Sequence, residues 1–306
     1  MDQIKLTTDL LADGWSTDEL QRLARTGALE RIRRGAYDQR PSADLDPVQR
    51  HRRLIAATVR QTSTDGAVSH MSAAVLHGLP TWRRQLSRVH LTRDQPGGGK
   101  VRRYVHLHAA PLPQEDVTLI DGHQATTVAR TVLDLLRTLP MERGVPIGDA
   151  ALRAGLSPDD LAAVAVRCHG WPGMCSARRS AAFLDGRSES VGESYSRVVM
   201  MRAGVPRPTL QYEVRDGLVL VGRADFGWED LRTLGEFDGK VKYAELLQPG
   251  QTAADAVYQE KCREDALRDL GWQVVRWSWA DLKDSAALRR RLERAFQRGR
   301  GASRPI

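Results

Sequence analysis

The chain has 306 residues, which is enough for two or three globular domains. Hydrophobic residues (41%) and charged residues (27%) occur in the proportions of a globular protein, which excludes a disordered chain, a fibrous repeat and a low-complexity tail. Lysine and arginine outnumber aspartate and glutamate by 46 to 38, so the formal net charge is +8 and we expect an acidic partner such as nucleic acid.

The positive charge is concentrated near the amino terminus. The segment from Arg22 to Arg103 contains 17 Lys/Arg and 6 Asp/Glu, an excess of 11, and the rest of the chain is slightly acidic. No run of about eighteen uncharged apolar residues occurs. The three cysteines lack CxxC spacing, which disfavours both a cysteine zinc site and a disulfide framework. We therefore expect a cytoplasmic protein.

The first predicted elements are a short helix and a hairpin. Ser16 and Glu19 form a capping box, Gly27 ends the helix, and a basic turn between short strands follows up to Tyr37. A polar helix followed by an arginine-rich hairpin is the arrangement of a winged helix-turn-helix, whose helix enters the major groove while the wing touches phosphate. A helical cap with a solvated basic loop is the alternative. The residues that we expect to contact DNA are Thr17, Gln21, Arg22, Arg25, Arg31, Arg33 and Arg34.

A linker at 42–47 leads to a segment of mixed helices and strands. The predicted helices and strands are 50–61 (helix), 69–78 (helix), 88–92 (strand), 104–108 (strand) and 127–139 (helix).

Histidines are frequent in this segment. His106 and His108 share a strand face, but no carboxylate or cysteine lies at ligand spacing beside them. We expect structural or phosphate-contacting roles for the histidines of this segment and no zinc site. The histidines concerned are His70, His77, His90, His106, His108 and His123.

Three blocks of this segment resemble AbiE-type antitoxins of type IV toxin–antitoxin systems. The blocks are Val68–Ala74 with Leu76–Leu79, Val89–Thr92, and Thr126–Leu135. With the winged helix, the resemblance covers roughly the first 140 residues. It implies a DNA-binding winged helix that represses its own operon, attached to a domain that counters a toxin encoded by a neighbouring gene. The resemblance assigns no toxin contact to particular residues.

Residues 145–167 predict two further helices, the second beginning at Ser157 with Pro158 in its first turn. Beyond Ser188 the pattern becomes helix, three strands, helix and strand, which predicts an α/β sheet flanked by helices. The predicted elements are 190–203 (helix), 209–214, 218–228 and 231–240 (strands), 259–270 (helix) and 273–279 (strand).

Acidic residues occupy particular places in this last pattern. Asp225 lies near the end of one predicted strand, and Glu236, Asp238 and Lys240 alternate along the next, so that they share a face. Carboxylates gathered on one face repel one another unless a cation compensates, and a hard divalent ion would do so. A solvated strand edge with ordinary salt bridges is the alternative reading.

The ordered acids resemble the PD-(D/E)XK nuclease superfamily, in its Vsr-like, restriction-endonuclease-like branch. The supporting residues are Gly192–Ser194, Arg223–Phe226, Glu236–Lys240 with Lys242 and Tyr243, and Glu260–Arg263 leading to Leu270–Trp277. The resemblance covers about the last 115 residues.

The resemblance implies a site for Mg²⁺ or Mn²⁺ held by Asp225 and by Glu236 or Asp238. Lys240 would orient or deprotonate the attacking water, and Glu193 would be an accessory acid. The sequence departs from the family pattern in register: Glu236-x-Asp238 places an acid where the lysine belongs, whereas Asp238-x-Lys240 restores it, and both readings stay open. Glu260 and Arg263 form either a supporting pair or a surface pair.

The sequence therefore predicts an α/β protein with four segments. These are a winged helix-turn-helix (1–48), an AbiE-antitoxin-like α+β domain (49–140), a helical connector (141–187) and a PD-(D/E)XK endonuclease-like domain with a mixed sheet flanked by helices (188–306). We expect a DNA-binding protein that hydrolyses DNA phosphodiester bonds with a metal ion, in phage defence or a toxin–antitoxin system. The alternative is a non-catalytic transcriptional repressor and antitoxin that uses the carboxy-terminal fold for binding.

Overall fold

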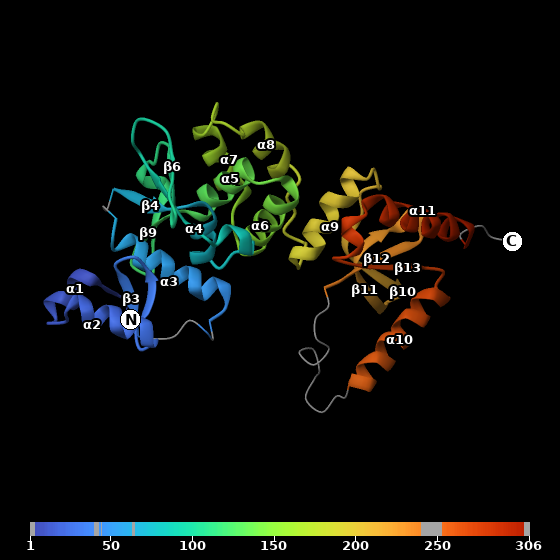
Figure 1. Ribbon diagram of the computed structural model, residues 1–306. Coiled ribbons are helices and arrows are strands. Elements are labelled where there is room, and N and C mark those ends of the chain that lie inside the picture. The colour runs from blue at the N-terminus through green and yellow to red at the C-terminus, as the bar shows by residue number, and fades with distance from the viewer. Residues whose placement is uncertain (1–3, 40–42, 44, 63–64, 240–252, 303–306) are drawn as a thin grey trace. The chain divides into compact units, whose positions relative to one another are not determined.

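The computed structural model describes residues 4–39, 43, 45–62, 65–239 and 253–302. The chain forms two compact units, Met1–Phe183 and Leu184–Ile306, called here the amino-terminal and carboxy-terminal units. Helices and sheets occur in both, which confirms the predicted α/β class (Figure 1). Within the described residues, no helix is both long and apolar enough to cross a membrane.

The amino-terminal unit begins with a small sheet of order β1-β3-β2 and two short helices. Ser16 caps α2 and forms the predicted capping box with Glu19, and Gly27 ends this helix in the left-handed conformation (φ 77°). Leu20 packs with Tyr37 in a small core, which holds α2 against the hairpin. The bounds are β1 Lys5–Leu6, α1 Thr7–Ala12, α2 Thr17–Thr26, β2 Glu30–Arg33 and β3 Ala36–Asp38.

A six-stranded sheet of order β6-β7-β5-β4-β9-β8 follows. Strands β5 and β7 are parallel, with His90 opposite His106. Val89 and Leu91 alternate into a core that Ile55 of α3 and Val75 of α4 complete. The bounds are α3 Pro47–Val59, β4 Gly66–Val68, α4 His70–Leu76, β5 Val89–Arg93, β6 Lys100–Val101, β7 Val105–Ala109, β8 Val117–Ile120 and β9 His123–Thr126, with short 3₁₀ helices at Arg83–Gln85 and Gln114–Asp116.

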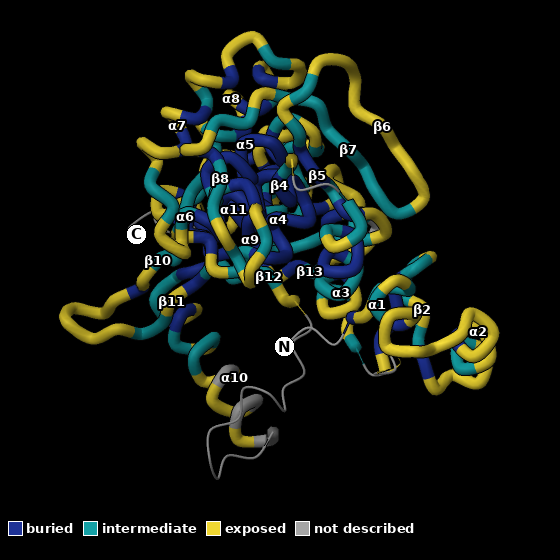
Figure 2. Tube along the Cα trace, turned by 90° about the vertical axis from the view of Figure 1, so that its left-hand side faces the viewer, coloured by how far each residue is buried: buried dark blue, intermediate teal, exposed yellow. Residues whose placement is uncertain are grey.

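Four helices complete the amino-terminal unit, and α5 lies at their centre. Figure 2 shows α4 and α5 in the colour of buried residues, and eight residues of α5 are buried. Arg130 on α5 is buried between Asp116 (2.7 Å) and Asp134 (2.9 Å), and its pair with Asp116 ties α5 to the 3₁₀ helix that precedes β8. The bounds are α5 Val128–Thr138, α6 Met141–Arg153, α7 Pro158–Arg167 and α8 Met174–Ala181.

The carboxy-terminal unit has the predicted order of helix, three strands, helix and strand, with one more helix at its end. Its sheet has the order β10-β11-β12-β13, with β12 and β13 parallel and the other neighbours antiparallel. The bounds are α9 Val191–Arg202, β10 Thr209–Asp216, β11 Val219–Trp228, β12 Thr233–Asp238, α10 Ala253–Asp269, β13 Gln273–Ser278 and α11 Ser285–Ala302, with 3₁₀ helices at Glu229–Leu231 and Asp281–Lys283.

Two hydrophobic cores lie on the two faces of this sheet (Figure 1). Helices α9 and α11 pack on the face that carries Phe226 and Trp277, and α10 packs on the face that carries Leu234. Gly192 lets α9 approach β12 closely, because a Cβ there would lie 1.9 Å from the ring of Phe237. This approach brings the first turn of α9 onto the end of the sheet where the predicted acids lie.

Candidate functional site

Asp225 lies at the point where the inward-facing side chains of β10 and β11 change from one face of the sheet to the other. Leu210 opposite Phe226 packs in the core under α9 and α11, whereas Tyr212 opposite Ala224 packs in the core under α10. Two residues along a regular strand would return to the same face, so the backbone turns over between these pairs. Gln211, which stands between them, has φ 52°, an uncommon conformation for a side-chain-bearing residue. Asp225 is therefore held at a local twist of the sheet.

The electrostatic surroundings of Asp225 disfavour its ionised form. Burial raises the pKa of this carboxyl to about 7, and the negative charges of Glu193, Glu236 and Glu189 act in the same direction. The backbone N–H of Phe237 donates a hydrogen bond of 2.7 Å to Asp225 Oδ2 and opposes this shift. Asp225 is thus an acid that lies close to other acids.

Glu193 lies in the first turn of α9 and is 7% exposed. Its Oε2 accepts hydrogen bonds from the backbone N–H of Glu189 (2.8 Å) and from Gln211 Nε2 (2.9 Å). The N-terminus of a helix favours negative charge, and these two donors replace the water that burial removes. Glu193 is therefore fixed in position, and it also anchors Gln211, the residue opposite Asp225.

Glu236 on β12 is held by two arginines. Its Oε1 accepts from Arg263 Nη2 of α10 (2.6 Å) and its Oε2 accepts from Arg276 Nε of β13 (2.7 Å). The parallel register places Glu236 directly opposite Arg276, which also contacts Glu264 (2.6 Å). Arg263 therefore contacts Glu236. The side chain of Glu260, which the sequence pairs with Arg263, lies outside the described residues. The alternation of acid and arginine balances the local charge.

The other predicted site residues lie at or beyond the end of β12. Asp238 is exposed at the last position of the strand. Lys240 lies outside the described residues, so its predicted role stays a prediction. Within the described part of the chain, the carboxylates of Glu193, Asp225 and Glu236 are not gathered as three ligands around one point.

The residues predicted to contact DNA lie on α2 and on the β2–β3 hairpin. Thr17, Gln21, Arg22 and Arg25 are exposed on α2, and Arg31 and Arg34 are exposed on the hairpin. Arg33 differs from the others: its Nη1 donates to Thr58 Oγ1 at 2.7 Å and its guanidinium lies 5.5 Å from the centre of the Tyr104 ring. Burial lowers the pKa of Arg33.

A cavity of about 540 Å³, called here the basic groove, connects this hairpin to β5, β6 and β7. None of its lining residues is acidic. Tyr104 at its wall contacts Arg33 and also Arg103, whose guanidinium lies 5.0 Å from the ring centre. The basic lining residues are Arg31, Arg33, Arg34, Arg93, Lys100, Arg102 and Arg103.

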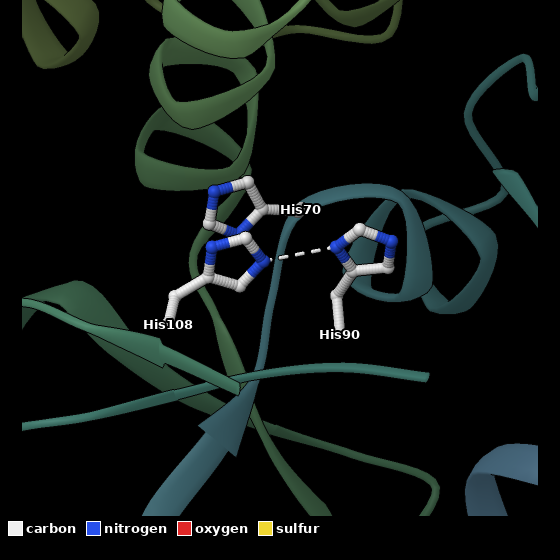
Figure 3. Close-up of side chains that lie close together, drawn as sticks. All are labelled: His70, His90 and His108. Carbon is white, nitrogen blue, oxygen red and sulfur yellow. Dashed lines mark hydrogen bonds between the residues drawn. The ribbon is translucent and has the colours of Figure 1, made fainter. Parts of the chain in front are cut away.

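The histidines of the central sheet form a cluster, although the sequence shows only that His106 and His108 share a face. The rings of His106 and His108 stack at 4.0 Å. His70 also stacks on His108, with 3.6 Å between the ring centres (Figure 3). His90 joins through a contact of 3.0 Å between its Nδ1 and His108 Nε2. Burial lowers the pKa of His90 to about 3 and that of His70 well below its usual value, so the rings are neutral.

No family model matches the chain. Two curated proteins of Mycobacterium tuberculosis are similar to it: uncharacterized protein MT2308 of strain CDC 1551 / Oshkosh and uncharacterized protein Rv2248 of strain ATCC 25618 / H37Rv. Each is 31% identical over 233 residues, which is 76% of this chain and 81% of the relative. The chain belongs to the family of these two mycobacterial proteins.

The chain is also similar to a solved structure from Mycobacterium tuberculosis, the organism of these two relatives. The crystal structure of the RV2827C protein from Mycobacterium tuberculosis aligns with 71% of this chain and 84% of its own, at a TM-score of 0.40 and 17% sequence identity. None of the three names states an activity or a ligand.

Among the residues around these acids, sequence reasoning missed Gln211, which carries no motif. It named Arg276 within a block that resembles the nuclease superfamily and Arg263 as part of a supporting or surface pair, but it did not place either arginine beside Glu236. Their contacts depend on strand register and on where α10 packs, which local sequence does not specify. One signal for the arginine partner exists. When β12 is paired with β13, Glu236 stands directly opposite Arg276, but this is visible only once the register of the two strands is known.

Proposed function

We propose that this chain binds duplex DNA through its amino-terminal unit and hydrolyses phosphodiester bonds at a metal-dependent endonuclease site in its carboxy-terminal unit. The observation that carries the proposal is Asp225: a partly buried carboxyl with its pKa raised to about 7, surrounded by Glu193, Glu236 and Glu189. A perturbed acid that lies among other acids is typical of functional sites. A divalent cation would offset both the burial and the repulsion that raise this pKa.

The donor atoms at this site fit Mg²⁺ or Mn²⁺. Both are hard cations that take oxygen ligands, and Mg²⁺ in proteins is usually held by one or two carboxylates together with water and substrate phosphate. Asp225 and Glu236, or Asp238 in the alternative register, would supply these carboxylates. When bound, the ion would polarise the phosphodiester and lower the pKa of its water ligand.

The chain's own residues would prepare the site for a phosphate. Phe237 N–H fixes one oxygen of Asp225, and Glu193 fixes Gln211 on the neighbouring strand. Arg263 and Arg276 place two guanidinium groups beside Glu236, where they would contact a phosphate oxygen and stabilise developing charge. Lys240 would assist the attacking water, as the resemblance to the superfamily implies.

The amino-terminal unit would deliver the DNA in the manner of a winged helix-turn-helix. Helix α2 presents Gln21, Arg22 and Arg25 to solvent, and the hairpin presents Arg31 and Arg34. Such a helix reads the major groove while basic side chains of the wing contact phosphates. The basic groove would extend this contact, because its lining has positive charge and an aromatic ring and lacks acids. An AbiE-like role in repressing an operon agrees with this arrangement.

One observation favours a second function, that of a non-catalytic repressor and antitoxin. Glu236 already has two arginine partners, so the charge of this acid is balanced without a metal. In that case the carboxy-terminal unit would serve only to bind a partner, such as a toxin encoded by a neighbouring gene.

Cleavage of supercoiled plasmid separates the two functions. We expect the wild-type chain to nick plasmid with Mg²⁺ or Mn²⁺ and to lose this activity in EDTA. Asp225→Asn and Glu236→Gln keep the shape of each side chain and should abolish nicking. Glu213→Gln is the matched control and should nick as wild type does. Glu213 is an exposed acid of β10 that pairs with Arg215 on the same strand. Absence of nicking by wild type, or full nicking by Asp225→Asn, contradicts the nuclease function.

A further inference from the structure

Three histidines of the amino-terminal unit meet from separate elements. His70 is the first residue of α4, His90 lies on β5 and His108 lies on β7 (Figure 3). One ring nitrogen of each lies within 4.8 Å of the other two. Within the ranges that the structure describes, these are the His, Cys, Asp or Glu side chains that gather as three potential ligands.

We propose that His70, His90 and His108 bind one divalent transition-metal ion, for which Zn²⁺ is the best match. Two nitrogens on a tetrahedral zinc ion, each about 2.05 Å from it, lie roughly 3.3 Å apart. The contact between His90 Nδ1 and His108 Nε2 is 3.0 Å, close to this separation. The wider separations, which reach up to 4.8 Å, would have to close by roughly 1.5 Å, and the stacked rings of His70 and His108 would have to turn so that their nitrogens converge on the ion. Imidazole ligands suit Zn²⁺, Cu²⁺ and Ni²⁺ and do not suit Mg²⁺.

The hydrogen bonds of the cluster are consistent with ligand histidines. His70 Nδ1 contacts Ser69 Oγ at 3.0 Å, and Ser69 Oγ accepts a hydrogen bond from Thr92 Oγ1 at 2.8 Å, so two hydroxyls hold this ring in place. Within the described residues, no carboxylate is hydrogen-bonded to the three rings.

The backbone at His70 is also unusual. Its φ is 50°, in the left-handed region that residues with side chains seldom adopt. Such a conformation persists only where the surroundings fix it, and here it directs the imidazole of a helix-starting residue toward the two strands.

Charged groups of both signs surround the cluster. The guanidinium groups of Arg130 and Arg137 act on His70 against positive charge, as Arg88 does on His90. Asp134 pairs with both Arg130 (2.9 Å) and Arg137 (2.8 Å) and offsets part of their charge.

A cavity of about 380 Å³ borders His70 and His108, with Thr92 and Asp134 in its wall. It gives a bound ion access to solvent and space for a water molecule as fourth ligand. His106 stacks on His108 but lies outside the ligand set. Three protein ligands with one position for water make this an open site.

Cobalt is the probe, because tetrahedral Co²⁺ absorbs visible light. The parent protein for this experiment is the chain with Asp225→Asn and Glu236→Gln. These two substitutions remove the proposed acidic site, so that an ion bound there does not contribute to the measured stoichiometry. The expected result is one tetrahedral Co²⁺ per chain, displaced by one Zn²⁺. His90→Gln and His108→Gln should weaken binding about tenfold or more. His77→Gln is the matched control, because this histidine is bonded to the Thr126 carbonyl oxygen and lies outside the ligand set.

Absence of a tetrahedral Co²⁺ spectrum in the parent chain overturns the proposal, as does unchanged affinity in His90→Gln or equal loss in His77→Gln. X-ray absorption of the Zn²⁺-loaded parent needs no histidine variant and therefore tests the site even where such a variant fails to fold. Coordination by three imidazoles supports the site. Coordination through sulfur, which would point to the exposed Cys175 or Cys262, overturns it.

Discussion

Asp225 on β11 accepts a hydrogen bond of 2.7 Å from the backbone N–H of Phe237 on β12. This bond joins two neighbouring strands through a side chain whose pKa burial raises to about 7. The bond favours the charged form, whereas burial and the surrounding acids disfavour it more strongly. Asp225 therefore keeps its position in both protonation states, and its charge changes near neutral pH.

The stability of the carboxy-terminal unit should decrease as pH rises from about 4 to about 7 in EDTA. In this range the folded state keeps a proton on Asp225 that the unfolded state has released, because the pKa is about 7 when folded and 3.8 ordinarily. This decrease amounts to about 4 kcal/mol of unfolding free energy in total and levels off above about pH 7, where Asp225 is ionised in both states. Urea unfolding followed by hydrogen–deuterium exchange of peptides from this unit measures the dependence.

Asp225→Asn is the control for this pH dependence. Asparagine can accept the same hydrogen bond from Phe237 N–H but does not titrate, so the decrease between pH 4 and 7 should become smaller. A variant that keeps the wild-type slope would show that another group is responsible.

Glu236→Gln should destabilise the carboxy-terminal unit by about 1–3 kcal/mol, because Arg263 and Arg276 each lose a charged hydrogen-bond partner. Arg276 keeps its contact with Glu264, which limits the loss. Chemical denaturation in EDTA measures this change. Glu213→Gln, at an exposed ion pair, should change stability by less than about 1 kcal/mol. Equal losses in the two variants would contradict the role of the two arginines.

Replacement of Arg22 and Arg25 by alanine should weaken duplex DNA binding and flatten its dependence on salt. Each lost phosphate contact lowers the slope of log K against log salt by about 0.9. Fluorescence anisotropy at several salt concentrations measures both effects. Arg178→Ala removes an exposed arginine of α8 and should leave the slope unchanged. A slope that falls equally in this control would mean that binding is not directed to α2.

Asp134→Ala should destabilise the amino-terminal unit by about 3–5 kcal/mol. The substitution leaves Arg130 buried with only Asp116 as its acidic partner and removes the acidic partner of Arg137. Thermal unfolding compared with Asp121→Asn, a substitution that removes the charge of an exposed acid paired with Arg52 and suits its left-handed backbone (φ 51°), measures the difference. A loss below about 1 kcal/mol would show that the buried network does not hold α5.

Local signals in the sequence predict most helices and strands. The capping box at Ser16 and Glu19 and the cap at Ser157 act within one turn of chain, so they appear as expected. The alternation around Asp225 and Glu236 likewise predicts neighbouring strands.

Short strands and long-range contacts were not predictable in the same way. Strands β1, β4, β6, β8 and β9 have two to four residues each, too few to show a periodic pattern. The meeting of His70 with His90 and His108 depends on the parallel register of β5 and β7 and on the start of α4. The arginines at Glu236 depend likewise on the pairing of β12 with β13.

Titration of Mn²⁺ into the full-length chain by calorimetry tests the central claim most directly. Mn²⁺ binds imidazole weakly, so it reports on the carboxylates. At about pH 8, where Asp225 is ionised, we predict one site in the wild type and in Glu213→Gln, and loss of that site in Asp225→Asn and in Glu236→Gln. No binding by the wild type, or an unchanged titration of Asp225→Asn, would contradict the claim that these carboxylates hold a divalent ion.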